Sequence, residues 1–409
     1  MHAIFHVYAL FVQNTAGLRI HCLRLPVGIS IPVFLCSVFC LAANAEKLSA
    51  VNCFSLAQVF RPGKSIFSPE GTAMTHFFRR TFAVGLLVAC LFAGSVLPSV
   101  SAAPTFDSGS TGADGAFAPT ANVILQVPDS GVFNFTTVNI PNGVTVTFTR
   151  NANNTPVTIL ASGNVTIAGG INIVGGAGSN VVNGTNNNIG TFRSTGGAGG
   201  PGGFDGGGGG GYVAPFTGVA GDGPGGGGGG LGTLDLTIEG GGAGGGFSSA
   251  GANANNIVNG ISYSGGVKGG VMYGSSVLLP LVGGSGGGGG GATSQYSGGS
   301  GGGGGGAILI ACSGTTSLSG QVSANGGDGG YGYNGGGGGS GGAIRVIATT
   351  LAGLATVDVR GGSGGVRSSY YYGGGGAPGY IRFEAYNFNN FNPLVVGGQG
   401  VAKIGRAHV

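Results

Sequence analysis

The chain has 409 residues, of which 98 are glycine and only 7% are charged, and its formal net charge is +4 at pH 7. The glycines stand in unbroken runs such as 206–211 and 286–291 and follow no strict three-residue repeat with proline, which excludes collagen. Five of the six cysteines and four of the five histidines precede residue 103. Residues 103–402 therefore have no partner for an internal disulfide and no histidine for acid–base catalysis or zinc binding.

Residues 74–102 have the pattern of an export signal. Two arginines at 79 and 80 are followed by an apolar stretch over 81–96 and by the small residues Val-Ser-Ala at 100–102, a cleavage pattern. The apolar stretch is shorter than the ~18–20 residues that cross a bilayer. We therefore expect cleavage after Ala102, a secreted or outer-surface location, and no membrane span in the mature part.

Both ends of the sequence differ in composition from the rest. Residues 1–73 contain a second signal-like segment over 25–42, which indicates a start codon assigned too early; a genuine leader with tandem hydrophobic segments is the alternative. Residues 403–409 resemble the translation of a sequencing-library adapter. On that interpretation the natural protein continues beyond Ala402, and any anchor, barrel or sorting signal would follow there.

Residues 103–160 are poorer in glycine and richer in strand patterns than the rest of the exported part. Alternating apolar residues lie over 132–140, 144–148 and 157–160, separated by turn-forming residues. We expect these residues to form an N-terminal cap and the first coils of a β-structure, since a cap protects an open sheet edge from pairing with other molecules.

Within 161–402, two short alternating strands followed by Gly-Gly-x-Gly recur. Ile308, Ile344 and Ile381 lie 36 and 37 residues apart, and residues 167–178 match residues 318–329 position for position. One such unit cannot bury its apolar face alone, so repeats of this length indicate stacked units. The sequence predicts an all-β fold, a parallel β-solenoid or β-helix with long glycine-rich loops. The predicted inward side chains are Ile308, Ile310, Leu318, Val322, Ala324, Ile344, Val346, Val357, Val359, Ile381, Phe383, Leu394 and Val396.

The long glycine runs admit two interpretations. Ordering a residue costs about 1–2 kcal/mol of backbone entropy, so the runs either stay mobile or hydrogen-bond to one another as polyglycine II rods. In the second form they resemble the glycine-rich domains of some phage tail-tip adhesins and of an insect antifreeze protein. Within the glycine-rich insertions, residues 234–238 and 276–282 have strand-like patterns.

Two low-complexity motifs carry a family resemblance. Residues 112–117 read GADGAF and residues 337–344 read GGGSGGAI. With these motifs the chain resembles secreted, glycine-rich bacterial proteins with β-helix repeats. The resemblance implies an extracellular, adhesin-like parallel β-helix and carries over no catalytic residue.

The number and positions of the charged residues limit the functions that this region can have. Seven of the 16 Lys/Arg and ten of the 12 Asp/Glu lie in 103–402, which gives this region a formal charge of −3 with dispersed basic residues and argues against nucleic-acid binding. Asp358 next to Arg360, and Glu384 next to Arg382 and one coil from Arg345, are predicted to be solvated charge pairs.

Calcium is a further candidate, because Asp205, Asp222 and Asp328 lie in glycine loops, although the regular aspartate repeat of calcium-binding β-rolls is missing. The lone Cys312 is interpreted as a small buried residue. We expect no resident cofactor.

Tyrosines are the strongest candidates for binding, because many lie in or next to glycine loops. The candidate ligand-binding residues are Tyr331, Tyr333, Tyr370, Tyr371 and Tyr372. Exposed tyrosine rings stack on sugars or on apolar protein surfaces; alternatively the tyrosines cover the outside of the solenoid. The first hypothesis is a secreted, non-enzymatic, adhesin-like protein that binds an extracellular glycan or protein. The alternatives are a polysaccharide lyase or hydrolase that uses acidic residues, and a structural filler without a ligand.

Overall fold

The computed structural model describes residues 9–13, 19–24, 34–38, 104–181, 193–234, 238–258, 261–366 and 372–404. The chain divides into two compact units, Met1–Val100 and Ser101–Val409. In the first unit, β1 (Ala9–Gln13), β2 (Arg19–Arg24) and β3 (Phe34–Val38) form an antiparallel sheet. The predicted export signal at 74–102 and the last five residues of the predicted adapter segment lie outside the described residues.

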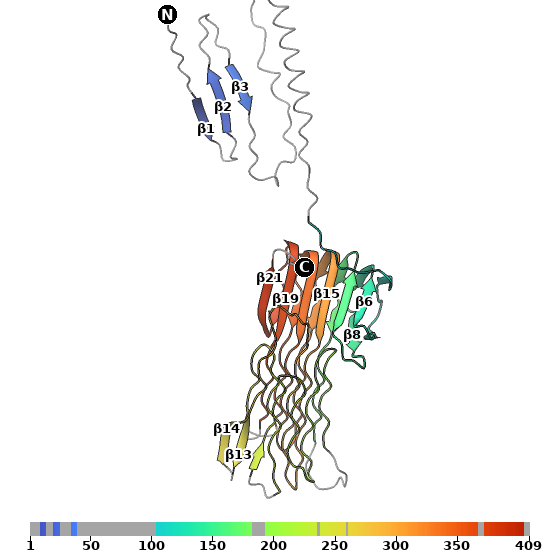
Figure 1. Ribbon diagram of the computed structural model, residues 1–409, viewed down its shortest axis with the longest axis vertical. Helices are drawn as coiled ribbons and strands as arrows, with labels where there is room; N and C mark the ends of the chain where they lie inside the picture. The colour runs from blue at the N-terminus through green and yellow to red at the C-terminus, as the bar shows by residue number, and fades with distance from the viewer. Residues whose placement is uncertain are drawn as a thin grey trace, which may run out of the picture. The chain divides into compact units, whose positions relative to one another are not determined.

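The second unit is built on two parallel β-sheets, and its described residues contain no helix (Figure 1). The nine-stranded sheet consists of β4 (Ala116–Phe117), β6 (Val132–Phe135), β7 (Thr137–Ile140), β9 (Val157–Ala161), β10 (Val165–Ile167), β15 (Ala307–Leu318), β17 (Ala343–Ala352), β19 (Gly379–Asn389) and β21 (Gly398–Ile404). The six-stranded sheet consists of β5 (Val123–Gln126), β8 (Thr145–Thr149), β11 (Gly170–Asn172), β16 (Gln321–Ser323), β18 (Thr356–Asp358) and β20 (Leu394–Val396). Because the chain alternates between the two sheets, each pass adds one strand level to both.

The predicted register of these passes is confirmed. Ile308 pairs with Ile344, and Ile344 pairs with Ile381, across β15, β17 and β19. The match between 167–178 and 318–329 is also a real neighbour relation, since β10 pairs with β15 and β11 with β16. These two passes are adjacent in space although residues 173–306 separate β11 from β15.

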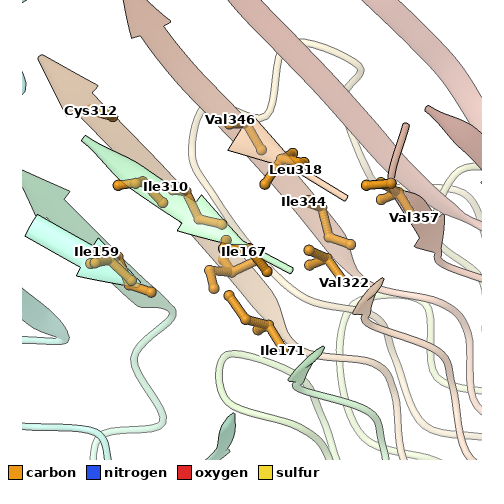
Figure 2. Packing of buried hydrophobic residues seen from close by; sticks show 14 of the residues in the cluster. Ile159, Ile167, Ile171, Ile310, Cys312, Leu318, Val322, Ile344, Val346 and Val357 are labelled. Carbon is orange, nitrogen blue, oxygen red and sulfur yellow. The ribbon is translucent and has the colours of Figure 1, made fainter. Parts of the chain in front are cut away.

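The hydrophobic core lies between the two sheets, where aliphatic side chains from successive passes stack on one another (Figure 2). In the six-stranded sheet the stacked positions are Val123, Val146, Ile171, Val322, Val357 and Val395. In the nine-stranded sheet they are Ile159, Ile310, Val346 and Phe383. Eleven of the thirteen predicted inward residues are buried here, from Ile308 to Phe383.

The last pass corrects the prediction for Leu394 and Val396. Val395 packs against the core, and Leu394 is 63% exposed. The connection from β19 to β20 has four residues, 390–393, whereas that from β17 to β18 has three, 353–355. One extra residue moves a strand by one position, and in a strand this exchanges the inward and outward faces.

The N-terminal segment of the second unit crosses four strands of the nine-stranded sheet. Its hydrogen bonds run from Phe106 N to Thr349 Oγ1 (2.8 Å), Ser108 N to Ser313 Oγ (3.0 Å), Ser108 Oγ to Ala161 O (2.8 Å) and Ser110 Oγ to Phe135 O (2.7 Å). The GADGAF motif follows, with Asp114 Oδ2 accepting a hydrogen bond from Asn134 N at 2.6 Å. The motif therefore fastens this segment to β6.

The glycine runs form excursions that leave the six-stranded sheet after β11, β16 and β18 and return to the nine-stranded sheet at β15, β17 and β19. In Figure 1 they extend away from the sheets as long, nearly straight segments. In segment 283–292 the backbone N–H groups donate to three neighbouring segments in rotation. The N···O distances are 2.7–3.0 Å. The first neighbour accepts through Asp222, Val219 and Phe216 from Gly286, Gly289 and Ala292. The second accepts through Gly305, Gly302 and Gly299 from Gly284, Gly287 and Gly290, and the third accepts through Ala243 and Gly240 from Gly288 and Gly291.

This three-residue period matches the polyproline II helix, which has three residues per turn and no internal hydrogen bonds. The carbonyl groups of the same segment accept from further neighbours, among them Gly207 and Gly227. A Cβ atom at Gly287 would lie 2.2 Å from the carbonyl oxygen of Gly337. At such glycine positions the runs are packed side by side too closely for a side chain, in agreement with the second of the two interpretations.

A smaller antiparallel sheet and a loop complete the glycine-rich region. The sheet contains β12 (Ile238–Gly240), β13 (Ala254–Val258) and β14 (Ile261–Val267). Residues 276–282, predicted to be strand-like, form a loop instead. Its Leu278 is buried against Phe247 with φ +54°, a left-handed conformation that a strand cannot contain.

Truncating the core column tests the stacking of the sheets. Ile310 is fully buried, so Ile310→Ala should lower the free energy of unfolding by about 2–5 kcal/mol. The control Leu354→Ala removes the same kind of side chain from a position that is 67% exposed, and should change stability little. Urea unfolding followed by circular dichroism measures both, and equal losses would contradict the described core.

Two alanine substitutions test the packing of the glycine runs. Gly287→Ala should destabilise the protein strongly, because the new methyl group meets a backbone carbonyl that cannot move without breaking hydrogen bonds. Gly375→Ala is the matched control, because the nearest atom to a Cβ there is 3.7 Å away. Removing backbone freedom from the unfolded state should make the control neutral or stabilising by about 0.4–1 kcal/mol. Similar melting temperatures for the two variants would show that the runs are not packed.

Candidate functional site

The turns that join the glycine runs at the end far from the two large sheets form the candidate site, and we call them the distal turns. Figure 1 shows β13 and β14 at this end. Hydrogen bonds connect neighbouring turns: Ala292 N donates to Phe216 O (2.7 Å), Ser294 Oγ to Leu234 O (2.9 Å), Tyr333 N to Ser297 O (2.9 Å) and Tyr331 N to Asn180 Oδ1 (2.8 Å). Turns that are far apart in the sequence therefore meet at one end of the bundle of glycine runs.

Tyr333 is held in place by two contacts. Its ring stacks on Tyr296, with ring centroids 4.7 Å apart and planes 8° apart, and its hydroxyl donates to Glu239 Oε1 at 3.2 Å. Glu239 is 3% exposed. Tyr333 is half-buried, and its two contacts connect its turn to the turn of Tyr296 and to β12.

Tyr331 and Tyr372 are the candidate tyrosines that reach the surface. Tyr331 is 55% exposed and Tyr372 is 38% exposed, whereas Tyr370 and Tyr371 lie outside the described residues. Large apolar side chains are exposed in the same turns, namely Val213, Leu231, Leu234, Ile261 and Val366. The distal turns therefore offer aromatic and aliphatic groups together.

Two other tyrosines pack around Phe247, one from a loop and one, Tyr380, from β19 of the nine-stranded sheet. Tyr273 and Tyr380 both contact Phe247 edge-on, with ring centroids 5.1 and 5.7 Å away. The Tyr273 hydroxyl donates to Gly283 O at 2.5 Å, and burial raises the pKa of Tyr273 to about 12. For Tyr273 the covering interpretation applies, so the tyrosines next to glycine loops serve two different purposes.

The acidic residues that were predicted to form solvated pairs are buried. Arg360 donates to both carboxylate oxygens of Asp358, which is 3% exposed. Glu384, 1% exposed, accepts hydrogen bonds from Arg345 and Arg382. The predicted pairings are confirmed. The prediction that these pairs are solvated is wrong, because both carboxylates lie close against the sheet while only Arg360 extends into solvent.

These pairs shift the pKa values of the carboxyl groups. For Glu384, burial disfavours the charged form, but the hydrogen bonds and charges of Arg345 and Arg382 outweigh it and hold the pKa below its usual range. For Asp358, burial raises the pKa, but the hydrogen bonds and charge of Arg360 outweigh burial, so the pKa is again lowered. Both carboxylates are therefore charged partners of arginine at neutral pH, unlike a general acid, which needs a raised pKa.

Two of the three candidate calcium ligands are neighbours, since Asp222 N donates to Asp205 O at 2.9 Å. Asp205 forms a two-point ion pair with Arg150 and accepts a hydrogen bond from Gly199 N at 2.7 Å. Asp328 Oδ1 accepts from Ser363 N at 2.7 Å. In the part of the chain that the structure describes, no three acidic, histidine or cysteine side chains converge in a manner suited to a metal ion.

Cys312 has surroundings that fit a structural residue. It is buried in the core, its Sγ lies 3.0 Å from Gly163 O, and burial raises the pKa of its thiol. A raised pKa lowers the fraction of reactive thiolate.

Sequence reasoning missed the contact between Tyr333 and Glu239. The two residues are 94 positions apart, and no repeat or motif links them. Only the packing order of the glycine runs brings β12 next to the turn that contains Tyr333.

Comparisons with known proteins return no relatives: no family model, no curated protein and no solved structure matches the chain. Among the described residues, no helix is long and apolar enough to cross a membrane.

The lowered pKa of Glu384 predicts acid sensitivity. The unfolded-state pKa of a glutamate is about 4.3. Because the folded state binds this proton more weakly, the stabilisation is complete above the unfolded pKa and is lost as the pH falls through the folded pKa. Wild type should thus lose more unfolding free energy between pH 7 and pH 3 than Glu384→Gln.

The same variant should be less stable at pH 7 by about 3–5 kcal/mol, because it leaves two arginines without their buried counter-charge. Urea unfolding at both pH values measures the difference. Parallel losses in wild type and variant would show that Glu384 does not contribute to the acid sensitivity.

Proposed function

We propose that the protein is a secreted or cell-surface, non-enzymatic β-solenoid that binds an extracellular glycan or protein through its distal turns. The observation that carries this proposal is the exposure of Tyr331 and Tyr372 beside exposed aliphatic side chains at one end of the bundle. Exposed apolar patches mark interaction sites, and tyrosine is enriched in such sites.

The glycine runs support the proposal by supplying a stiff extension. Their hydrogen bonds to neighbours on several sides fix each run without a core of side chains. The described residues of the distal turns are thereby held away from the two large sheets. A binding surface that is ordered beforehand loses less conformational entropy when a partner binds.

The enzymatic alternative, a polysaccharide lyase or hydrolase, gains no specific support. The buried carboxylates Glu239, Asp358 and Glu384 belong to three different sheets, on β12, β18 and β19. Glycosidases need two carboxyl groups within about 5–9.5 Å across one substrate bond. These three buried carboxylates therefore do not form such a pair.

Removing the two exposed rings tests the proposal. The double variant Tyr331→Ala/Tyr372→Ala should weaken binding at least about tenfold, since hot-spot tyrosines contribute about 2 kcal/mol or more each. Binding of labelled protein to a glycan array and to intact cell surfaces gives the readout. The control Leu354→Ala changes an exposed side chain in a turn between the large sheets, and should bind as wild type does.

Unchanged binding by the double variant would exclude the distal tyrosines as the contact surface. Absence of binding by wild type to all glycans and cells tested would favour the structural filler.

A further inference from the structure

Two arginines stand side by side on the outer face of the nine-stranded sheet. Arg345 of β17 and Arg382 of β19 are register partners. Like charges directly opposite each other in neighbouring strands are destabilising. Glu384 is the one carboxylate that forms an ion pair with them within the described chain. Two positive charges are thus balanced by one negative charge, and a net positive charge remains.

The hydrogen bonds leave the ends of both guanidinium groups available. Arg345 Nε donates to Glu384 Oε1 at 2.8 Å, and Arg382 Nε donates to the same oxygen at 2.7 Å. Within the described residues these are the side-chain hydrogen bonds that the two arginines make. Each guanidinium group has five N–H donors, four of them on its two Nη atoms. Those Nη donors are free to bind a ligand.

The surroundings hold both side chains in place. Two positions before the arginines, Ala343 and Tyr380 are covered by Phe247 and Leu278. Two positions after Arg345, Ile347 is covered by Phe106. The arginine side chains between these two apolar clusters are 11% and 13% exposed, so they reach solvent but have little freedom. Burying a charge without a partner is costly unless something compensates it.

We propose that Arg345 and Arg382 form a binding site for an oxyanion, a carboxylate or sulfate group. Glu384 orients both guanidinium groups through Nε, and their Nη atoms donate to the oxygens of the ligand. Paired N–H donors match the planar spacing of such oxygens, and these charge-assisted hydrogen bonds are stronger than neutral ones. The anion supplies the second negative charge that the cluster lacks. The site does not involve the distal turns and does not depend on their function.

Calorimetric titration tests this site and separates the two sources of the anion. Sodium sulfate and sodium glucuronate are titrated into the full chain at constant ionic strength, with sodium chloride and neutral glucose as controls. Wild type should give saturable heat with a stoichiometry of one for at least one of the two oxyanions and none for glucose. Stronger binding of glucuronate would identify a sugar carboxylate as the preferred ligand, and stronger binding of sulfate would identify a sulfate group.

Variants assign the heat to the arginine pair. Arg382→Gln leaves the pair of Arg345 and Glu384 intact, and should fold while its affinity falls at least about tenfold, the effect of losing charge-assisted hydrogen bonds. Arg360→Gln is the matched control, because Arg360 is 61% exposed and paired with Asp358 on the other sheet, and should bind as wild type does.

If Arg382→Gln does not fold, Arg382→Lys keeps the charge but removes the paired donors and should also bind more weakly. Absence of saturable heat in wild type, full affinity in the Arg382 variant that folds, or an equal loss in Arg360→Gln would overturn the proposal.

Discussion

The structure depends on backbone hydrogen bonds made between chain segments that carry no side chains. In the glycine runs each residue points its N–H toward a neighbouring segment, and the direction turns by one neighbour per residue, as segment 283–292 shows. Such packing requires that the backbones touch, which a Cβ atom would prevent. Because glycine loses more conformational freedom on folding than any other residue, only the simultaneous formation of many hydrogen bonds with several neighbours can offset that loss.

The two large sheets supply the frame that aligns these runs. Every excursion starts at the six-stranded sheet and ends at the nine-stranded sheet, so the register of the strands fixes where each excursion begins and ends. Aliphatic columns such as Val146, Ile171 and Val322 set that register. Side-chain contacts also connect the sheets to the glycine runs. Arg150, which follows β8, forms an ion pair with Asp205, and Asn154 Oδ1 accepts a hydrogen bond from Gly202 N at 3.0 Å. Side-chain burial thus determines the position of segments that have no side chains.

Most of the sheet architecture could be predicted, because aliphatic periodicity encodes it directly. The pairing of Ile308, Ile344 and Ile381 was recognisable as a repeat, whereas Leu394 was misplaced since a single extra residue in a connection has no sequence pattern. The neighbours of each glycine run could not be predicted, because runs of identical composition offer the same backbone hydrogen bonds to any other run. For the same reason the tyrosine-bearing turns were recognisable as candidates, but the meeting of Tyr333 with Tyr296 and Glu239 was not.

A scaffold of this kind restricts chemistry to its ends and outer faces. The interior of the bundle admits glycine and a few small or hydrogen-bonded side chains such as Ser285 and Ser340, so the distal turns and the outer faces of the sheets remain for recognition. These two places differ in character: the distal turns expose tyrosine and aliphatic groups, while the outer face of the nine-stranded sheet contains Arg345 and Arg382 with a single carboxylate between them. An apolar surface and a cationic pair select different ligand groups. Because the glycine runs separate them, a partner long enough to contact both would have to lie along the bundle, whereas small ligands would bind to each place independently.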